Sequence, residues 1–256
     1  MRSTHLLVIS CLAAILLLPS DMQPQEGEAG IVSAVYDGDT IRVSLESGRS
    51  EIVRLIGVDA PELNDTREEV RFFALMSKRF AFTMLFRERV SLTFDWERRD
   101  KYDRLLAFVS CRHGLFNEFV IKQGFASAYL RFPYRNDYRQ RFQAAEREAR
   151  AEGRGMWRPE PYPMIDPQDT RDHIGELARV RFWCAEVENR GKFLYLHAQD
   201  GDFSALIDQK DLESFPRPNA LTGRELIVSG LLEEYRGQPQ MLLFLPLQLR
   251  SAPHSE

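Results

Sequence analysis

Apolar and polar residues alternate in short stretches through the first half of the chain, which is the pattern of half-buried strands. The strands this pattern predicts cover residues 30–36, 41–45, 52–58, 90–94 and 105–109. Asp37-Gly38-Asp39-Thr40 and Glu46-Ser47-Gly48-Arg49 are turn sequences between the first three. The first half is therefore predicted to open with a three-stranded meander.

Three other segments are predicted to be helices, and in the first of them apolar residues recur at helical spacing. The first predicted helix starts at Asn64 or Asp65 and places Glu68 and Glu69 near its positive end. The other two cover residues 116–123, with Gly124 as a stop, and residues 137–152. The predicted class is mainly β with α (α+β).

A proline-dense stretch separates this first half from a second series of predicted strands. These strands cover residues 178–183, 193–196, 203–207, 226–230 and 241–245. Five strands with an interruption after the third suggest a second, small OB-like β-barrel. The predicted domains are residues 30–158 and 173–250, joined by a linker over residues 159–172.

The N-terminus combines Arg2 with an uncharged, largely apolar run over residues 6–19. That run is shorter than the roughly 20 residues of a membrane-spanning helix, which favours an export signal over residues 1–20. An uncleaved membrane anchor is the alternative. Both place the remainder outside the cytoplasm, secreted or periplasmic in the first case and membrane-anchored in the second. Residues 21–29 are predicted to be a spacer.

Charge and cysteine content narrow the function. The chain has a net charge of -4, yet residues 31–160 hold 23 Lys/Arg against 20 Asp/Glu, a net of +3. Residues 161–256 hold 10 against 15, a net of -5. The positive balance of the first domain is therefore compatible with phosphate binding at particular basic residues. Three cysteines without paired spacing argue against a zinc site and favour free thiols at Cys111 and Cys184.

The candidate chemistry centres on residues 53–62, where an apolar stretch ends in a turn. Arg54 stands among apolar neighbours, and a desolvated guanidinium needs an anion beside it. Asp59 and Glu62 follow on the turn. Two interpretations are open: a phosphate-and-metal site, or a strand end with a structural salt bridge. Arg104, at the entry to another predicted strand, is the second arginine of this kind.

Three ordered blocks together resemble the staphylococcal nuclease (thermonuclease) family. They are Asp37-Gly38-Asp39-Thr40, residues 54–62 (Arg-Leu-Ile-Gly-Val-Asp-Ala-Pro-Glu) and residues 100–107 (Asp-Lys-Tyr-Asp-Arg-Leu-Leu-Ala). Gly124-Phe125-Ala126 and Gly155-Met156-Trp157 fit the same pattern. The resemblance covers about residues 30–158 and implies a five-stranded OB barrel with three helices, in agreement with the strand and helix order above.

The resemblance also implies site roles. Asp39 and Asp59 match calcium-binding carboxylates, and Ala60 matches a position that offers its backbone carbonyl to the metal. Glu62 matches the residue that holds or activates the attacking water. Arg54 and Arg104 match the two arginines that grip the phosphate.

Two positions depart from the family pattern. Ala60 stands where the best-known member has Thr. Because the implied ligand is the backbone carbonyl, this change of side chain is compatible with metal binding. Asp103 stands where Gly is common, directly before Arg104. Its carboxylate either draws Arg104 away from phosphate or orders the turn, and the second is favoured because Asp tolerates turn geometry.

The resemblance implies a calcium-dependent nuclease (Ca²⁺ as cofactor) that hydrolyses DNA and RNA with low sequence specificity. The alternative is a non-catalytic nucleic-acid-binding or envelope scaffold protein built from OB domains. For the C-terminal module, single-stranded nucleic acid is favoured as partner over a protein contact.

Overall fold

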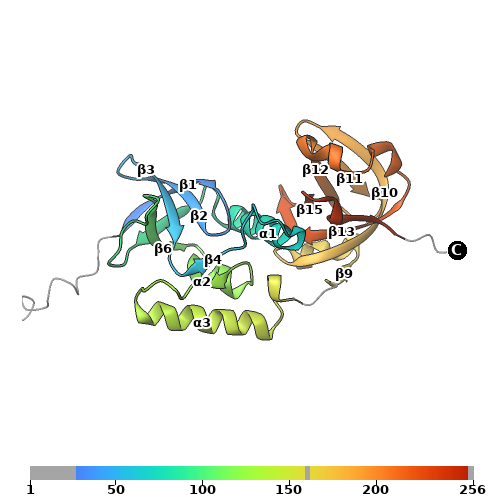
Figure 1. The fold of residues 1–256 in the computed structure, drawn as a ribbon. Helices are drawn as coiled ribbons and strands as arrows, with labels where there is room; N and C mark the ends of the chain where they lie inside the picture. Colours follow the sequence, from blue (N-terminus) through green and yellow to red (C-terminus); the bar gives the residue numbers. More distant parts are fainter. Residues whose placement is uncertain (1–26, 159–161, 253–256) are drawn as a thin grey trace, which may run out of the picture.

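The computed structural model describes residues 27–158 and 162–252, which form two β units joined through a helix (Figure 1). The predicted export signal or anchor over residues 1–20 lies outside the described residues, as do most of the spacer and the start of the linker. The predicted division of the chain into domains stays a prediction.

The first unit is a closed five-stranded barrel. Its main sheet runs in the order β3-β2-β1-β5-β6-β7, and a parallel pairing of β3 with β6 closes it. Its strands are β1 (Glu28–Val35), β2 (Thr40–Leu45), β3 (Ser50–Leu55), β5 (Arg89–Thr93), β6 (Leu105–Cys111) and β7 (Gly114–Leu115). A separate two-stranded sheet pairs β4 (Val58–Asp59) with β8 (Ser127–Ala128). The predicted OB-like barrel and the mainly β class with α are confirmed.

Three helices accompany the barrel: α1 (Glu68–Leu85), α2 (Phe116–Lys122) and α3 (Asn136–Ala151). The predicted start of the first helix at Asn64 or Asp65 is wrong, because α1 begins at Glu68. The Asp65 carboxylate accepts a hydrogen bond from the Arg67 backbone N–H at 2.8 Å, which holds the preceding residues in a turn. Glu68 and Glu69 do lie in the first helical turn, as expected.

Residues 52–58 were predicted as one strand, but the structure interrupts it. β3 ends at Leu55, and the chain turns at Gly57, whose φ is +73°. A Cβ there would stand 2.7 Å from the Phe142 ring, so glycine is required by both conformation and space. β4 then leaves the barrel, which carries Asp59 away from the strand.

The second unit is an eight-stranded sheet whose main path runs β14-β15-β12-β11-β10-β13-β16, with β9 paired to β10. Its strands are β9 (Met164–Ile165), β10 (Leu177–Arg190), β11 (Phe193–Ala198), β12 (Ser204–Asp208), β13 (Glu225–Leu231), β14 (Glu233–Tyr235), β15 (Gln238–Leu243) and β16 (Leu249–Ser251). The short 3-10 helix η2 (Gly155–Trp157) follows α3, before the linker. The short 3-10 helices η3 (Pro167–His173), η4 (Gln209–Ser214), η5 (Pro218–Ala220) and η6 (Pro246–Gln248) come after the linker begins. The predicted five strands are present, while their closure into an OB-like barrel stays a prediction.

Helix α1 packs on both units, and Figure 1 shows it between the two sheets. Tyr162 of the linker and Leu177 and Leu231 of the second unit belong to the same buried cluster as the barrel interior. The Phe72 and Tyr162 rings stack at 6.3 Å between centroids, and Arg79 forms a two-pronged ion pair with Glu233. The two units therefore share apolar core instead of meeting only through a linker.

No helix in the described part of the chain is long and apolar enough to cross a membrane. Cys111 and Cys184 are free thiols, the first half-buried and the second buried, in line with the expectation of free thiols.

Candidate active site

Arg54, near the end of β3, fastens the turn that follows it. Its Nη1 donates hydrogen bonds to the Leu55 carbonyl at 3.0 Å and the Val58 carbonyl at 2.7 Å. These two bonds satisfy one side of a mostly buried guanidinium with backbone oxygens. The other side stays available for anions.

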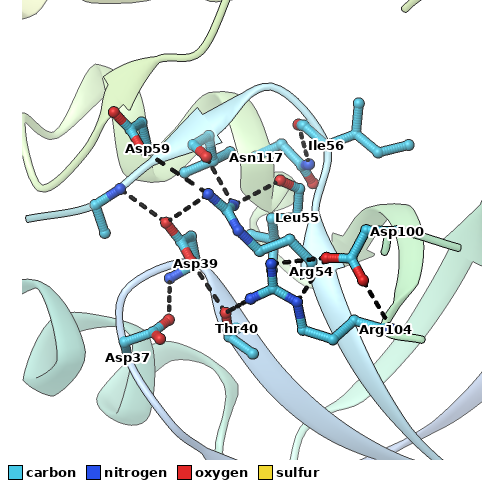
Figure 2. Close-up of polar contacts among 12 residues, drawn as sticks. Asp37, Asp39, Thr40, Arg54, Leu55, Ile56, Asp59, Asp100, Arg104 and Asn117 are labelled. Carbon is cyan, nitrogen blue, oxygen red and sulfur yellow. Dashed lines mark hydrogen bonds and ion pairs between the residues drawn. The ribbon is translucent and has the colours of Figure 1, made fainter. Parts of the chain in front are cut away.

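That other side faces two carboxylates, as Figure 2 shows. Arg54 Nη2 lies 3.0 Å from Asp39 Oδ2 and 3.9 Å from Asp59 Oδ1. Asp39 comes from the β1–β2 turn and Asp59 from β4, so the barrel brings three separate segments together. The sequence-predicted group of Arg54, Asp39 and Asp59 is thus adjacent in space.

Asp39 is buried and strongly held. Its Oδ2 also accepts from the Ala60 backbone N–H at 2.8 Å, and its Oδ1 accepts from the Thr40 hydroxyl at 3.0 Å. Burial raises the pKa of Asp39 to about 7, and the nearby Arg54 charge offsets this only in part. A carboxylate that is this costly to ionise would gain from a further cation beside it.

Arg104 enters the site from the start of β6. Its side chain forms an ion pair with Asp100 at 2.7 Å, and its Nη1 approaches the Thr40 hydroxyl at 3.4 Å. Hydrogen bonds from Arg104 to Asp100 lower the pKa of Asp100 despite its partial burial. Because Thr40 also binds Asp39, a short polar chain links the two arginine clusters.

The turn before Arg104 is held by the Asp100 carboxylate, which accepts from the backbone N–H groups of Tyr102 and Arg104, and Asp103 occupies its left-handed position. Its φ is +63°, in the left-handed region that glycine adopts freely and Asp tolerates. Its carboxylate is 3.5 Å from Arg99 and largely exposed, so the partner of Arg104 is Asp100 and not Asp103.

Asp103→Gly is therefore expected to leave the rate of the nuclease activity that the sequence resemblance implies within about twofold of the parent, because no contact to Arg104 is lost. Asp103→Val should lower stability by about 1–2 kcal/mol, since a branched side chain is strained at positive φ. Thermal midpoints and initial rates measure both, with Lys101→Val as the control in the same turn. A large gain in rate for Asp103→Gly would show that the carboxylate restrains Arg104.

Ala60 and Glu62 follow Asp59 in the segment after β4. Glu62 is exposed on the turn after β4, three residues past Asp59. Ala60 is buried and contacts Asp39 through its N–H. In the described part of the chain, no three His, Cys, Asp or Glu side chains are grouped to hold a metal. The calcium site that the resemblance implies has only two carboxylates, Asp39 and Asp59, and its third protein ligand is a backbone carbonyl.

Several residues of the site were missed by the sequence analysis. Asn117 is fully buried; its amide donates to the Ile56 carbonyl at 2.8 Å and accepts from the Val109 N–H, so it supports the turn. Asp100 was quoted in a motif but given no role. A pocket beside Arg54 and Arg104 is also lined by aromatic residues, namely Trp96, Tyr129, Phe132 and Tyr134. Trp96 and Phe132 are exposed large side chains, a signal that alternation alone does not separate from loop residues.

The fold and the site define a class: an OB-type barrel with two arginine–carboxylate clusters opening on one pocket. A family model described as staphylococcal nuclease homologue matches residues 52–159. The thermonuclease of Staphylococcus intermedius is 37% identical over 131 residues, which cover 51% of this chain and 77% of the relative. The thermonuclease of Staphylococcus hyicus is 30% identical over 168 residues, covering 60% of this chain and 96% of the relative.

The chain belongs to the staphylococcal nuclease family, and its class of activity is that of a nuclease, a phosphodiester hydrolase. Endonuclease YhcR of Bacillus subtilis, 34% identical over 142 residues, matches across only 12% of its own length. The relatives match about half of this chain or slightly more, and the family model ends at residue 159, before the second β unit.

Proposed function

We propose that the protein is a calcium-dependent nuclease that hydrolyses phosphodiester bonds of DNA and RNA with little sequence preference after export from the cytoplasm. The observation that carries the proposal is that Arg54, Arg104 and Asp59 line one pocket, with Asp39 held against Arg54. Export is supported by the sequence pattern of residues 1–20 alone.

The residues fit a hard divalent cation. Asp39 and Asp59 offer carboxylate oxygens, Ala60 offers a backbone carbonyl, and calcium takes oxygen ligands of these kinds with water completing the shell. The raised pKa of the buried Asp39 is the structural sign that negative charge there is under-compensated. A bound Ca²⁺ supplies Lewis-acid stabilisation of charge on the phosphate oxygens.

The two arginines bind the phosphate. Hydrolysis builds charge on the equatorial oxygens of phosphorus, and planar guanidinium forks placed beforehand stabilise it. Arg54 is held by two backbone carbonyls and Arg104 by Asp100, so both forks keep their orientation before substrate arrives. Asp59 is 54% exposed and 3.9 Å from Arg54, which makes it the partner that yields most easily to a phosphate.

Glu62 takes the proton of the attacking water. It is exposed to water three residues after Asp59, a residue that lines the pocket, and its carboxylate serves as general base. Phosphate contacts carry no sequence information and are common to DNA and RNA, which supports the broad substrate range.

Glu62→Gln tests the proposal most directly. The amide cannot accept a proton, so cleavage of single- and double-stranded DNA and of RNA with calcium should fall by about 10²–10⁴-fold. Substrate binding measured in chelator should remain. Glu68→Gln, an exposed residue at the start of α1, is the matched control. If the parent shows no chelator-sensitive cleavage, the calcium-dependent enzyme is rejected, and salt-dependent binding without cleavage would support the scaffold alternative.

Asp39→Asn is expected to raise the thermal midpoint in chelator at pH 8 by about 2–6 °C while abolishing stabilisation by calcium. The native Asp39 carboxyl binds its proton more tightly than in the unfolded chain, with a pKa of about 7 against 3.8. Stability therefore falls as pH rises through that window, and the neutral amide removes this loss. The gain should vanish below about pH 4, where both states of the parent are protonated. Asp172→Asn, at an exposed residue of the second unit, is the control, and an equal gain for it at pH 8 would contradict the assignment to Asp39.

A further inference from the structure

The outer face of β10 carries a row of two arginines and a tryptophan. Arg179, Arg181 and Trp183 alternate with the buried residues Ala178, Val180, Phe182 and Cys184. On the neighbouring strands, Arg181 lies opposite Ile227 of β13, and Ile227 lies opposite Arg250 of β16. Arg181 and Arg250 thus flank one position of the sheet, about 10 Å apart at the backbone. We call Arg179, Arg181, Arg250 and Trp183 the arginine strip.

The strip is a concentration of uncompensated positive charge. Arg181 and Arg250 are exposed and form no ion pair with the described residues of either unit. Arg179 is half-buried and donates from Nε to the Tyr162 carbonyl at 2.8 Å, with no carboxylate partner among the same residues. Residues 161–256 carry a net charge of -5, so an unpaired arginine cluster there is not a consequence of general basicity.

Trp183 adds an aromatic surface at the end of this row. Its side chain is 49% exposed, an unusual state for the largest apolar residue on a strand whose inward neighbours are fully packed. Across the sheet it lies opposite Glu225 of β13. At the other end, the strip opens on a cleft against α1 that is lined by Phe72, Phe73 and Glu69.

We propose that the arginine strip is a second binding site for single-stranded nucleic acid, distinct from the cleavage pocket. Guanidinium groups in a row bind successive phosphates, and an exposed indole stacks on an unpaired base of any sequence. The site rests on the proposed function, because it gives the second unit the task of holding the polymer that the first unit cuts.

A second, half-buried row of aromatic side chains in this unit lies beside residues of mixed charge. Phe193, Tyr195 and His197 on β11 lie opposite Arg190, Glu188 and Glu186 of β10. His197 contacts Glu188 at 3.2 Å, and Arg190 is itself paired with Glu188. On this face Arg190 and His197 are already paired with Glu188, whereas Arg181 and Arg250 have no carboxylate partner among the described residues, so the charge available to a phosphate chain favours the arginine strip. The strip thereby gives the predicted single-strand partner of the C-terminal module a definite location.

Binding of a fluorescent oligothymidylate of about 20 nucleotides, in chelator and over a series of salt concentrations, tests the site. For Arg181→Ala with Arg250→Ala, the salt slope should shrink by about 1.4, since each single-strand phosphate contact contributes about 0.7. Trp183→Ala should weaken binding about tenfold with an unchanged slope. Arg190→Ala, on the same strand but outside the strip, should match the parent.

Hydrolysis of a small chromogenic thymidine phosphodiester, which spans the cleavage pocket alone, separates this proposal from the proposed function. Strip variants should keep the parent's rate on it. Absence of hydrolysis by the parent would reject the nuclease proposal and would leave the proposed binding at the arginine strip unaffected. Unchanged oligothymidylate affinity and slope in the double arginine variant, with unchanged thermal midpoint, would overturn the strip. Equal affinity of parent and Trp183→Ala for oligothymidylate would remove the stacking role, and binding of polyglutamate in preference to oligothymidylate would assign the face to an acidic protein.

Discussion

Ending the chain after Arg158 is expected to lower the thermal midpoint of the nuclease unit by about 10 °C or more. Helix α1 packs on the barrel with one side and contacts the second unit with the other. Phe72 and Phe73 would gain exposure, and restoring aromatic side chains to water costs about 1.5–3 kcal/mol each. Calorimetry or circular dichroism of the truncated and full chains, both in chelator, measures the difference.

A single substitution tests the contact between the two units without shortening the chain. Glu233 is 3% exposed, and its carboxylate is held by Arg79 of α1 at 2.6 and 2.8 Å. Glu233→Ala leaves a largely buried guanidinium without its partner and should cost about 3 kcal/mol. Glu234→Ala, the exposed neighbour, is the control. If the truncated chain melts at the same midpoint as the full chain, the shared core contributes nothing and the two units are independent.

The shared core is the feature that the sequence could not reveal. The apolar positions of α1 predicted a helix that packs on the barrel. The same apolar pattern would be seen whether the helix packed on one unit or on both. The proline-dense linker suggested separate units, while Tyr162, directly after the undescribed linker residues, inserts beside Phe72. Long-range pairs such as Arg79 with Glu233 leave no trace in local periodicity.

Local patterns did predict most of the strands and the helices. Alternation failed where strands are too short to alternate: β4, β9, β14 and β16 have two or three residues each and are defined by their partners. It also ran through Gly57, where the turn is fixed by positive φ and by the Phe142 ring from a distant helix.

The site was predicted to the level of residue type and segment. Arg54 and Arg104 stood out because a charge at the edge of an apolar strand needs a partner. Which anion each one holds could not be predicted, because Asp39, Asp59 and Asp100 reach them only once the barrel closes. Asn117 escaped notice for the same reason: its side-chain hydrogen bonds join β6 to the turn at Ile56.

Arg54→Lys should lower kcat by about 10²–10³-fold although it keeps the charge. The guanidinium donates to the Leu55 and Val58 carbonyls on one side and to Asp39 on the other. An ammonium is a point donor without a planar fork, so it cannot hold the turn and also present a bidentate surface to a phosphate. Initial rates at saturating substrate, with the thermal midpoint recorded for each variant, measure the effect.

Two comparisons decide whether the loss belongs to phosphate binding or to a distorted turn. Arg42→Lys, on β2 of the same barrel, makes the same exchange away from the pocket and should keep the parent's rate. Arg54→Ala should regain part of its activity when free guanidinium ion is added, since the ion can occupy the vacated position beside Asp39. A turn distorted beyond repair would show no such rescue. If Arg54→Lys retains the parent's kcat, the fork has no role in the transition state and Arg54 serves only as the structural salt bridge first considered.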